Sequence, residues 1–109
     1  MTQQHSFDYI VIGSGASGAV VANRLSADPS HRVLLLEAGP GYDKPDLADV
    51  GGFVRLWGSD VDWKLTTEPQ AGMAGRQITI NQGLVAGGST SVNAMMYVRG
   101  NPRNFDMWN

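Results

Sequence analysis

The sequence predicts an α/β fold that opens with a parallel βαβ unit over residues 7–37. Residues 7–12 form a short β-branched and aromatic run, and residues 33–36 form a second apolar run, as expected of buried strands. Between them, residues 16–25 carry small and apolar side chains at the spacing of a helix that packs on a sheet. Strand, helix and strand so close together predict a parallel pair joined by a right-handed crossover.

The elements of this unit follow from the residues in chain order. Tyr9–Ile12 has no polar interruption, which indicates a strand buried on both faces, as in a parallel sheet. Ala16–Leu25 is expected to be the helix, and the pair Asp28-Pro29 lies beyond its end, where a helix cannot continue. Val33–Leu36 is the second strand, and Glu37 follows it directly.

The next part of the chain is irregular. Residues 39–75 form an extended excursion that is rich in Gly, Pro and Asp, and we expect no more than one short helix in it. Trp63–Thr67 and Arg76–Ile80 predict a hairpin, because the apolar residues of the second segment alternate with polar ones.

A second glycine loop spans residues 81–100, and we expect it to lead into a helix near Ser89–Met95. The last residues begin another helix, in which Phe105 and Trp108 are three positions apart. One βαβ unit supplies only two parallel strands, and such strands need neighbours that this sequence barely provides. Either the later segments add strands, or the molecule continues in another polypeptide or in a removed portion.

Composition excludes several classes of protein. The chain has 109 residues, a formal net charge of −2 and no cysteine. The absence of a basic excess argues against nucleic acid as a partner, and the lack of cysteine excludes a disulfide framework. The N-terminal residues lack the pattern of a secretory signal, and no apolar run approaches the length of a membrane span. The expected location is the cytoplasm.

Gly13, Gly15 and Gly18 fit the pattern G-x-G-x-x-G at the turn between the first strand and the helix. In a Rossmann-like unit these glycines permit the tight turn, the approach of a pyrophosphate and close packing of helix on strand. Glu37 follows Gly18 by 19 positions and can accept hydrogen bonds from the two hydroxyls of an unphosphorylated adenosine ribose. The predicted cofactor contacts of this first loop are Gly13, Gly15, Ala16, Ser17, Gly18, Glu37 and Ala38.

The motif has an alternative interpretation as a structural turn with an incidental surface glutamate, and the βαβ unit alone does not separate FAD from NAD. The later residues do separate them. They are Glu37-Ala38-Gly39, residues 66–70 (TTEPQ) and residues 83–108, with Gly87-Gly88-Ser89-Thr90-Ser91-Val92-Asn93, Tyr97 and Arg99-Gly100 as the most specific. Because of these residues, the whole chain (1–109) resembles the N-terminal part of the FAD-binding domain of the glucose–methanol–choline (GMC) flavoprotein oxidoreductases. Leu84 and Ala86 depart from the family pattern, which usually has a basic and a larger apolar residue there.

The resemblance implies a larger two-domain fold in which the second glycine loop runs along the pyrophosphate and under the isoalloxazine of FAD. Glycine backbone would admit the cofactor, hydroxyl and amide side chains would contact it, and the N–H groups of residues 94–96 would face the flavin. The contacts predicted for this loop are Val85, Gly87, Gly88, Ser89, Asn93, Ala94, Met95 and Met96. The alternative for the glycines is a tight turn with a helix cap at Ser89 or Thr90. Val92 occupies the position at which some family members carry a histidine joined to FAD, so we expect non-covalent FAD.

The resemblance also implies the reaction. It is that of an FAD-dependent alcohol oxidase or dehydrogenase, in which a hydride passes from the CH–OH carbon of a small alcohol to flavin N5. The catalytic histidine of the family lies near its far C-terminus, so no catalytic residue is expected in this chain. Because chains of the family are several times longer, the resemblance also implies a companion polypeptide that carries the rest of the enzyme. The alternative function is an NAD-binding regulatory module without catalysis, which would explain the first glycine loop but not the second.

The remaining candidates have structural interpretations. His5 and His31 are expected to be solvated, and the acidic residues show no metal-binding pattern. Trp57, Trp63 and Trp108 are interpreted as packing residues rather than as groups that stack on a flavin.

Overall fold

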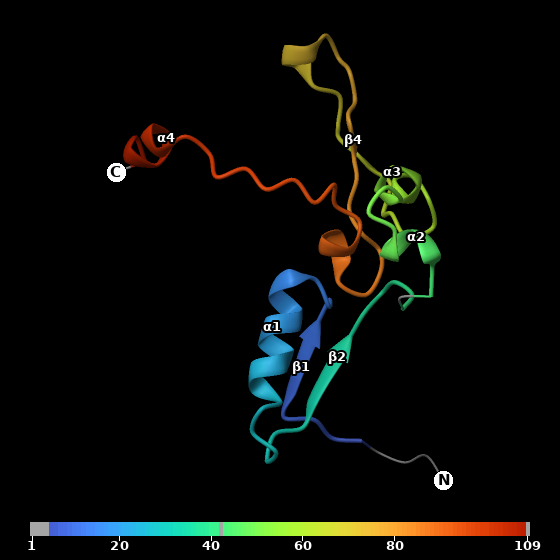
Figure 1. Cartoon of the computed structure of the whole chain (residues 1–109), viewed down its shortest axis with the longest axis vertical. Coiled ribbons are helices and arrows are strands. Elements are labelled where there is room, and N and C mark those ends of the chain that lie inside the picture. Colours follow the sequence, from blue (N-terminus) through green and yellow to red (C-terminus); the bar gives the residue numbers. More distant parts are fainter. Residues whose placement is uncertain (1–4, 42, 109) are drawn as a thin grey trace.

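The computed structural model describes residues 5–41 and 43–108, and it begins with the predicted βαβ unit (Figure 1). Strand β1 (Tyr9–Ile12) pairs in parallel with β2 (Val33–Leu36), from Tyr9 opposite Val33 to Ile12 opposite Leu36. Helix α1 (Ala16–Leu25) connects them and has the bounds that the sequence predicts. Both the parallel pairing and the crossover helix are confirmed.

The expectation that the strands are buried on both faces is wrong for this chain. Helix α1 covers one face, on which the position of Gly18 lies against the side chain of Val11. On the opposite face, Ile10 is 59% exposed and Ile12 is 85% exposed. We call Ile10, Ile12 and their partners Leu34 and Leu36 the open face. In the part of the chain that the structure describes, α1 is the one other element that packs closely on these strands.

Two short helices interrupt the excursion, where the sequence predicts one at most. Helix α2 (Pro45–Ala48) and helix α3 (Phe53–Leu56) pack on each other. The guanidinium of Arg55 donates to Asp46 Oδ1 and Asp49 Oδ2, both at 2.7 Å, and so joins the two helices. These exposed ion pairs connect the two helices across the glycines that separate them in the sequence.

The predicted hairpin is present and shorter than expected. Strand β3 (Leu65–Thr66) pairs antiparallel with β4 (Thr79–Ile80), and the 3₁₀ helix η1 (Ala71–Met73) lies in the connection. The left-handed backbone of Ala74, with φ of 56°, ends η1 and begins the return of the chain.

The prediction of a helix near Ser89–Met95 is wrong. Only a 3₁₀ helix forms there, η2 (Gly88–Ser91), and Met95 has a positive φ of 54° that no α-helix admits. Asn93 Oδ1 accepts from the N–H of Met95 at 2.7 Å, which replaces a helical hydrogen bond by a local turn. Helix α4 (Pro102–Asp106) confirms the final helix, and its cap Asn101 accepts from the N–H of Arg103.

The hydrophobic core lies outside the βαβ unit. Leu56, Val61, Val85 and Val92 are buried, and Leu47 packs against them. Trp57 reinforces this cluster, because its indole N–H donates to the carbonyl of Val92 at 3.2 Å. The core therefore joins α3, the segment before the hairpin and the second glycine loop.

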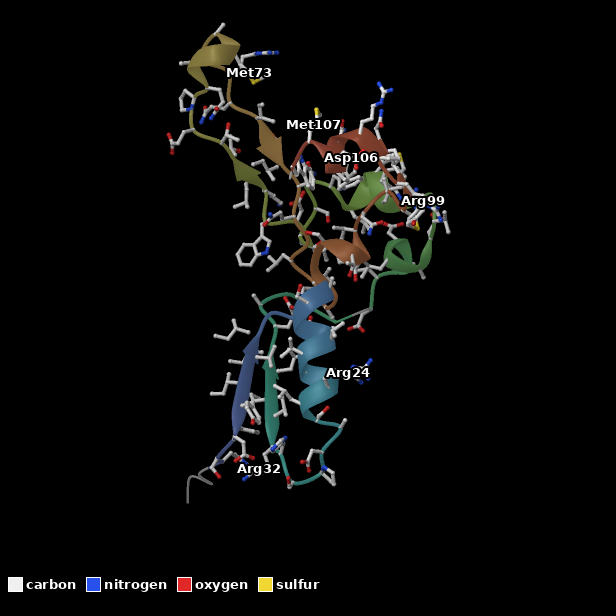
Figure 2. The ribbon with its side chains drawn as sticks, turned by 90° about the vertical axis from the view of Figure 1, so that its left-hand side faces the viewer. Arg24, Arg32, Met73, Arg99, Asp106 and Met107 are labelled. Carbon is white, nitrogen blue, oxygen red and sulfur yellow. The ribbon has the colours of Figure 1, made fainter. Side chains whose placement is uncertain are left out.

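The chain is extended rather than spherical. Its radius of gyration is 18.4 Å, compared with about 13 Å for a compact domain of ~100 residues. The hairpin and the segment that carries α4 project from the body in different directions (Figure 1). In Figure 2, Met73 lies near the tip of the hairpin. Arg32 lies at the opposite end of the molecule, in the connection between α1 and β2. Within residues 5–41 and 43–108, no helix has the length and apolar character that crossing a bilayer requires.

Candidate cofactor site

A cleft of about 580 Å³ lies at the carboxyl ends of β1 and β2. This is the edge at which open α/β sheets bind their ligands. Both glycine loops contribute to it. The lining residues are Ile12, Gly13, Gly15, Leu36, Glu37, Ala38, Trp63, Gly83, Gly88 and Ser89.

The glycines of the first loop meet three different requirements. Gly13 has a φ of 89°, so the turn after β1 uses a left-handed backbone that favours glycine. A Cβ at Gly18 would lie 1.9 Å from the carbonyl oxygen of Gly13, so α1 reaches the turn only without a side chain there. A Cβ at Gly15 would meet no atom within 4 Å, so the space over this residue is open. The first loop thus presents bare backbone to the cleft at Gly15.

The carboxylate of Glu37 is held by donors from the two loops that flank it. Oε2 accepts from the hydroxyl of Ser14 at 2.6 Å and from its N–H at 2.7 Å, and Oε1 accepts from the N–H of Gly39 at 3.0 Å. The hydroxyl of Ser14, followed by these N–H groups, lowers the pKa of Glu37 from 4.5 to about 2. Glu37 is therefore ionised at neutral pH.

Ser14 also joins the two glycine loops. Its buried hydroxyl oxygen accepts from the N–H of Gly87 at 3.1 Å while the hydroxyl donates to Glu37. Close backbone contact supports this connection, since a Cβ at Gly88 would lie 3.1 Å from the Cα of Gly15. One hydroxyl thus connects the end of β2, the first glycine loop and the second glycine loop.

The second loop is fixed from its other side by a buried carboxylate. Asp62 accepts four hydrogen bonds, of which Oδ2 receives those from the N–H of Gly58 and the amide of Asn81, at 2.7 and 2.9 Å. Oδ1 receives those from the N–H groups of Lys64 and Gln82. Burial raises the pKa of Asp62, but these donors outweigh it and hold the pKa below its usual value. Asp62 therefore orders the start of the loop that carries Gly83.

Comparisons with known proteins identify the family of this chain. The family model described as GMC oxidoreductase matches residues 7–109. The chain belongs to the GMC oxidoreductase family. The resemblance inferred from the sequence is thereby confirmed.

Relatives in the GMC family are much longer than this chain. An uncharacterized GMC-type oxidoreductase of Mycobacterium tuberculosis is 48% identical over 101 residues, which cover 93% of this chain and 19% of that protein. An alcohol dehydrogenase [acceptor] of Pseudomonas putida is 44% identical over 94% of this chain and 19% of its own length. The crystal structure of pyridoxine 4-oxidase from Mesorbium loti superimposes with a TM-score of 0.83 at 42% identity, over 94% of this chain and 20% of that one. The chain thus spans about a fifth of the length of these relatives and has their Rossmann-like N-terminal fold.

The structure brings part of the predicted GMC cofactor site together. Six of the predicted residues line the cleft, namely Gly13, Gly15, Glu37, Ala38, Gly88 and Ser89. Ala16, Ser17 and Gly18 form the first turn of α1 beside it. Gly87 contributes its N–H to Ser14, and Val85 is fully buried in the core.

The later residues of the second loop lie elsewhere. Asn93 and Met95 line a separate cavity of about 250 Å³ against α2 and α3. Ala94 and Met96 lie with them along an open depression, and Met96 is largely exposed. The amide oxygen of Asn93 is occupied by the N–H of Met95. Contact of these four residues with a flavin stays a prediction.

Sequence reasoning missed several residues of the site. Ser14 occupies a variable position of the glycine motif, and its neighbour in space, Gly87, is 73 positions away in the sequence. The sequence favours a packing role for Trp63, whereas in the structure Trp63 is 50% exposed and lines the cleft. A large aromatic residue at the base of a predicted hairpin is the only signal that pointed to it. Among the described residues, no group of three metal-ligating side chains comes together.

Proposed function

We propose that this chain provides the dinucleotide-binding part of an FAD-dependent oxidoreductase that acts on CH–OH groups. One observation carries the proposal: the two glycine loops and the ionised Glu37 converge on a single cleft at the carboxyl ends of parallel strands. Family membership favours FAD over the NAD of a regulatory module. When bound, FAD supplies the acceptor for a hydride from the substrate.

The residues present fit the adenosine diphosphate part of FAD. The open space over Gly15 admits a pyrophosphate to the backbone. Helix α1 has no side-chain cap at its N-terminus, so its first N–H groups and the positive end of the helix dipole remain available to phosphate oxygens. Glu37 lines the same cleft as a ribose acceptor. The half-exposed ring of Trp63 offers an apolar wall.

Binding without a covalent bond is part of the proposal. Val92 is an alkyl side chain, and with 5% exposure it is packed in the hydrophobic core beside Val61 and Val85. A core valine presents no nucleophile to a flavin. The second loop would then hold the cofactor by backbone contacts at Gly88 and by the hydroxyl of Ser89.

The proton-transfer step requires residues from outside this chain. His31 lies at the far end of the βαβ unit, with its ring 5.1 Å from that of Tyr9, and His5 is exposed before β1. Neither histidine lines the cleft. We propose that a companion polypeptide supplies the catalytic base and covers the open face, and that a small alcohol is the substrate. The relatives named for alcohol and pyridoxine oxidation support this substrate class.

The test is the cofactor content of the purified protein that carries this chain, together with any polypeptide that copurifies. We expect a yellow protein that releases FAD into the supernatant on acid precipitation, and whose flavin absorbance is bleached by a small primary alcohol without oxygen. A colourless protein that gains thermal stability from NAD but not from FAD would overturn the proposal. Flavin that stays with the precipitate would overturn the non-covalent attachment alone.

A further inference from the structure

The hydroxyl of Ser14 occupies the central position among the contacts of the site. It is buried, and both of its hydrogen bonds reach residues distant in sequence, Glu37 and Gly87. A hydroxyl has one proton to donate and accepts with its lone pairs, so the two bonds use it as donor and acceptor at once. Neither alanine nor glycine at this position would make either bond.

These contacts determine how Glu37 can bind a ribose. An ionised carboxylate offers about four acceptor positions. Both bonds to Oε2 come from Ser14, and Oε1 accepts from Gly39. Ser14 and Gly39 therefore orient the carboxylate that the cleft presents to a ribose.

The same hydroxyl determines the position of the second loop. The N–H of Gly87 points to Ser14, and Gly87 has a φ of 88° where the loop turns into η2. The next anchor of this loop is the bond from the N–H of Ala86 to the carbonyl of Pro40, at 2.9 Å. Without the Ser14 hydroxyl, the N–H of Gly87 would lose its partner at the point where the loop enters the cleft.

We propose that Ser14 is a positioning residue that fixes the ribose-binding carboxylate and the second glycine loop relative to each other. This inference rests on the proposed function, since it assigns Glu37 to a cofactor ribose. It predicts that removal of one hydroxyl changes both the recognition of the adenosine part and the order of a loop 73 positions away.

The experiment uses the complete protein after removal of its flavin, with ADP and inorganic pyrophosphate as probes. Ser14→Ala should weaken ADP binding by about tenfold. Pyrophosphate lacks the ribose, so its binding should weaken by less than about threefold. A general loosening of the turn would weaken both probes equally. Amide hydrogen exchange at Gly87 should become faster in the same variant.

Two further variants complete the test. Ser30→Ala is a matched control, because Ser30 also donates its hydroxyl and its N–H to one oxygen of a carboxylate, that of Asp28, outside the cleft. It should change neither binding nor exchange at Gly87. Ser14→Thr keeps the hydroxyl and should restore ADP binding. If Ser14→Ala is insoluble, Ser14→Cys, with its weaker donor, should show the same changes.

The outcomes separate this inference from the proposed function. Unchanged ADP affinity and unchanged Gly87 exchange in the Ser14 variants would overturn the positioning role, as would equal losses for ADP and pyrophosphate. If the unmodified protein binds neither ADP nor FAD, the proposed function fails instead, while exchange at Gly87 still reports the contact with Ser14.

Discussion

The hydrogen bonds that Glu37 accepts stabilise its ionised form. The hydroxyl of Ser14 and the N–H of Gly39 are the first two causes that lower its pKa to about 2, and no charged side chain contributes to the shift. A folded-state pKa below the unfolded value means that the ionised group contributes stability above pH 4.5 and loses it as the pH falls toward 2. The site residue is therefore also a source of acid sensitivity.

Glu37→Gln tests this linkage. The neutral amide does not titrate, so the difference in thermal stability between the unmodified protein and the variant should be largest above pH 4.5 and should shrink toward pH 2. The measurement is the melting temperature of both flavin-free proteins across this range. Asp28→Asn is the comparison, because the hydroxyl of Ser30 also lowers the pKa of this exposed carboxylate outside the cleft, so a difference of the same sign is expected there. A difference for Glu37→Gln that stays constant with pH would contradict the assignment.

Residues within a local motif were predictable, and residues that act across the fold were not. Gly13, Gly15, Gly18 and Glu37 are recognisable because their spacing alone places them around one turn. The role of Ser14 depends on where the second loop returns, which no local pattern specifies. The same holds for Asp62, whose burial becomes visible only when four donors from two segments surround it.

At the scale of elements, helices and strands with a clear apolar periodicity are predictable from the sequence, whereas the structure of glycine-rich segments is not. The bounds of α1 and β2 agree with the sequence because their apolar side chains follow the periods of a helix and of a buried strand. In the second loop, Thr90 and Ser91 donate their hydroxyls to the carbonyls of Gly87 and Ala86, and such local bonds replace a helix. The element that enters the cleft is therefore a 3₁₀ turn, η2, and not an α-helix.

Two glycine substitutions, in the turn after β1 and in the first turn of α1, distinguish an effect on stability from an effect on cofactor binding. Gly18→Ala places a Cβ 1.9 Å from backbone, so it should destabilise the protein by about 3 kcal/mol or more. Gly15→Ala has open space and an ordinary φ of −62°, so it should cost at most about 1 kcal/mol. Because its methyl group occupies the space assigned to the pyrophosphate, Gly15→Ala should still lower FAD affinity by more than about tenfold.

Urea unfolding and FAD titration measure these two effects on the same samples. The assignment would be wrong if Gly15→Ala bound FAD with unchanged affinity. It would also be wrong if Gly18→Ala were as stable as the unmodified protein, because helix and turn would then not pack as closely as the structure shows.

At the scale of the whole molecule, buried apolar side chains are distributed unevenly along the chain. The core of Leu56, Val61, Val85 and Val92 lies between the excursion and the second loop, whereas the strands of the βαβ unit are covered on one face by α1. The open face follows from the small sheet, since two strands with one helix bury one face only. The large radius of gyration has another origin, because the hairpin and the segment that carries α4 project from the body. The sequence predicted this shortage of strands correctly, because a count of elements suffices for it.

The open face provides the last prediction, on the proposed companion polypeptide. Ile10 and Val54 are both 59% exposed, on β1 and on α3 respectively. A charge at Ile10 costs this chain little by itself, because the side chain is already in water. If the companion covers the open face, Ile10→Asp would bury an unpaired carboxylate in the assembly and should abolish copurification of the companion. Val54→Asp, with the same exposure away from β1 and β2, should leave copurification intact. Equal recovery of the companion with both variants would show that the apolar surface of β1 and β2 is not where it binds.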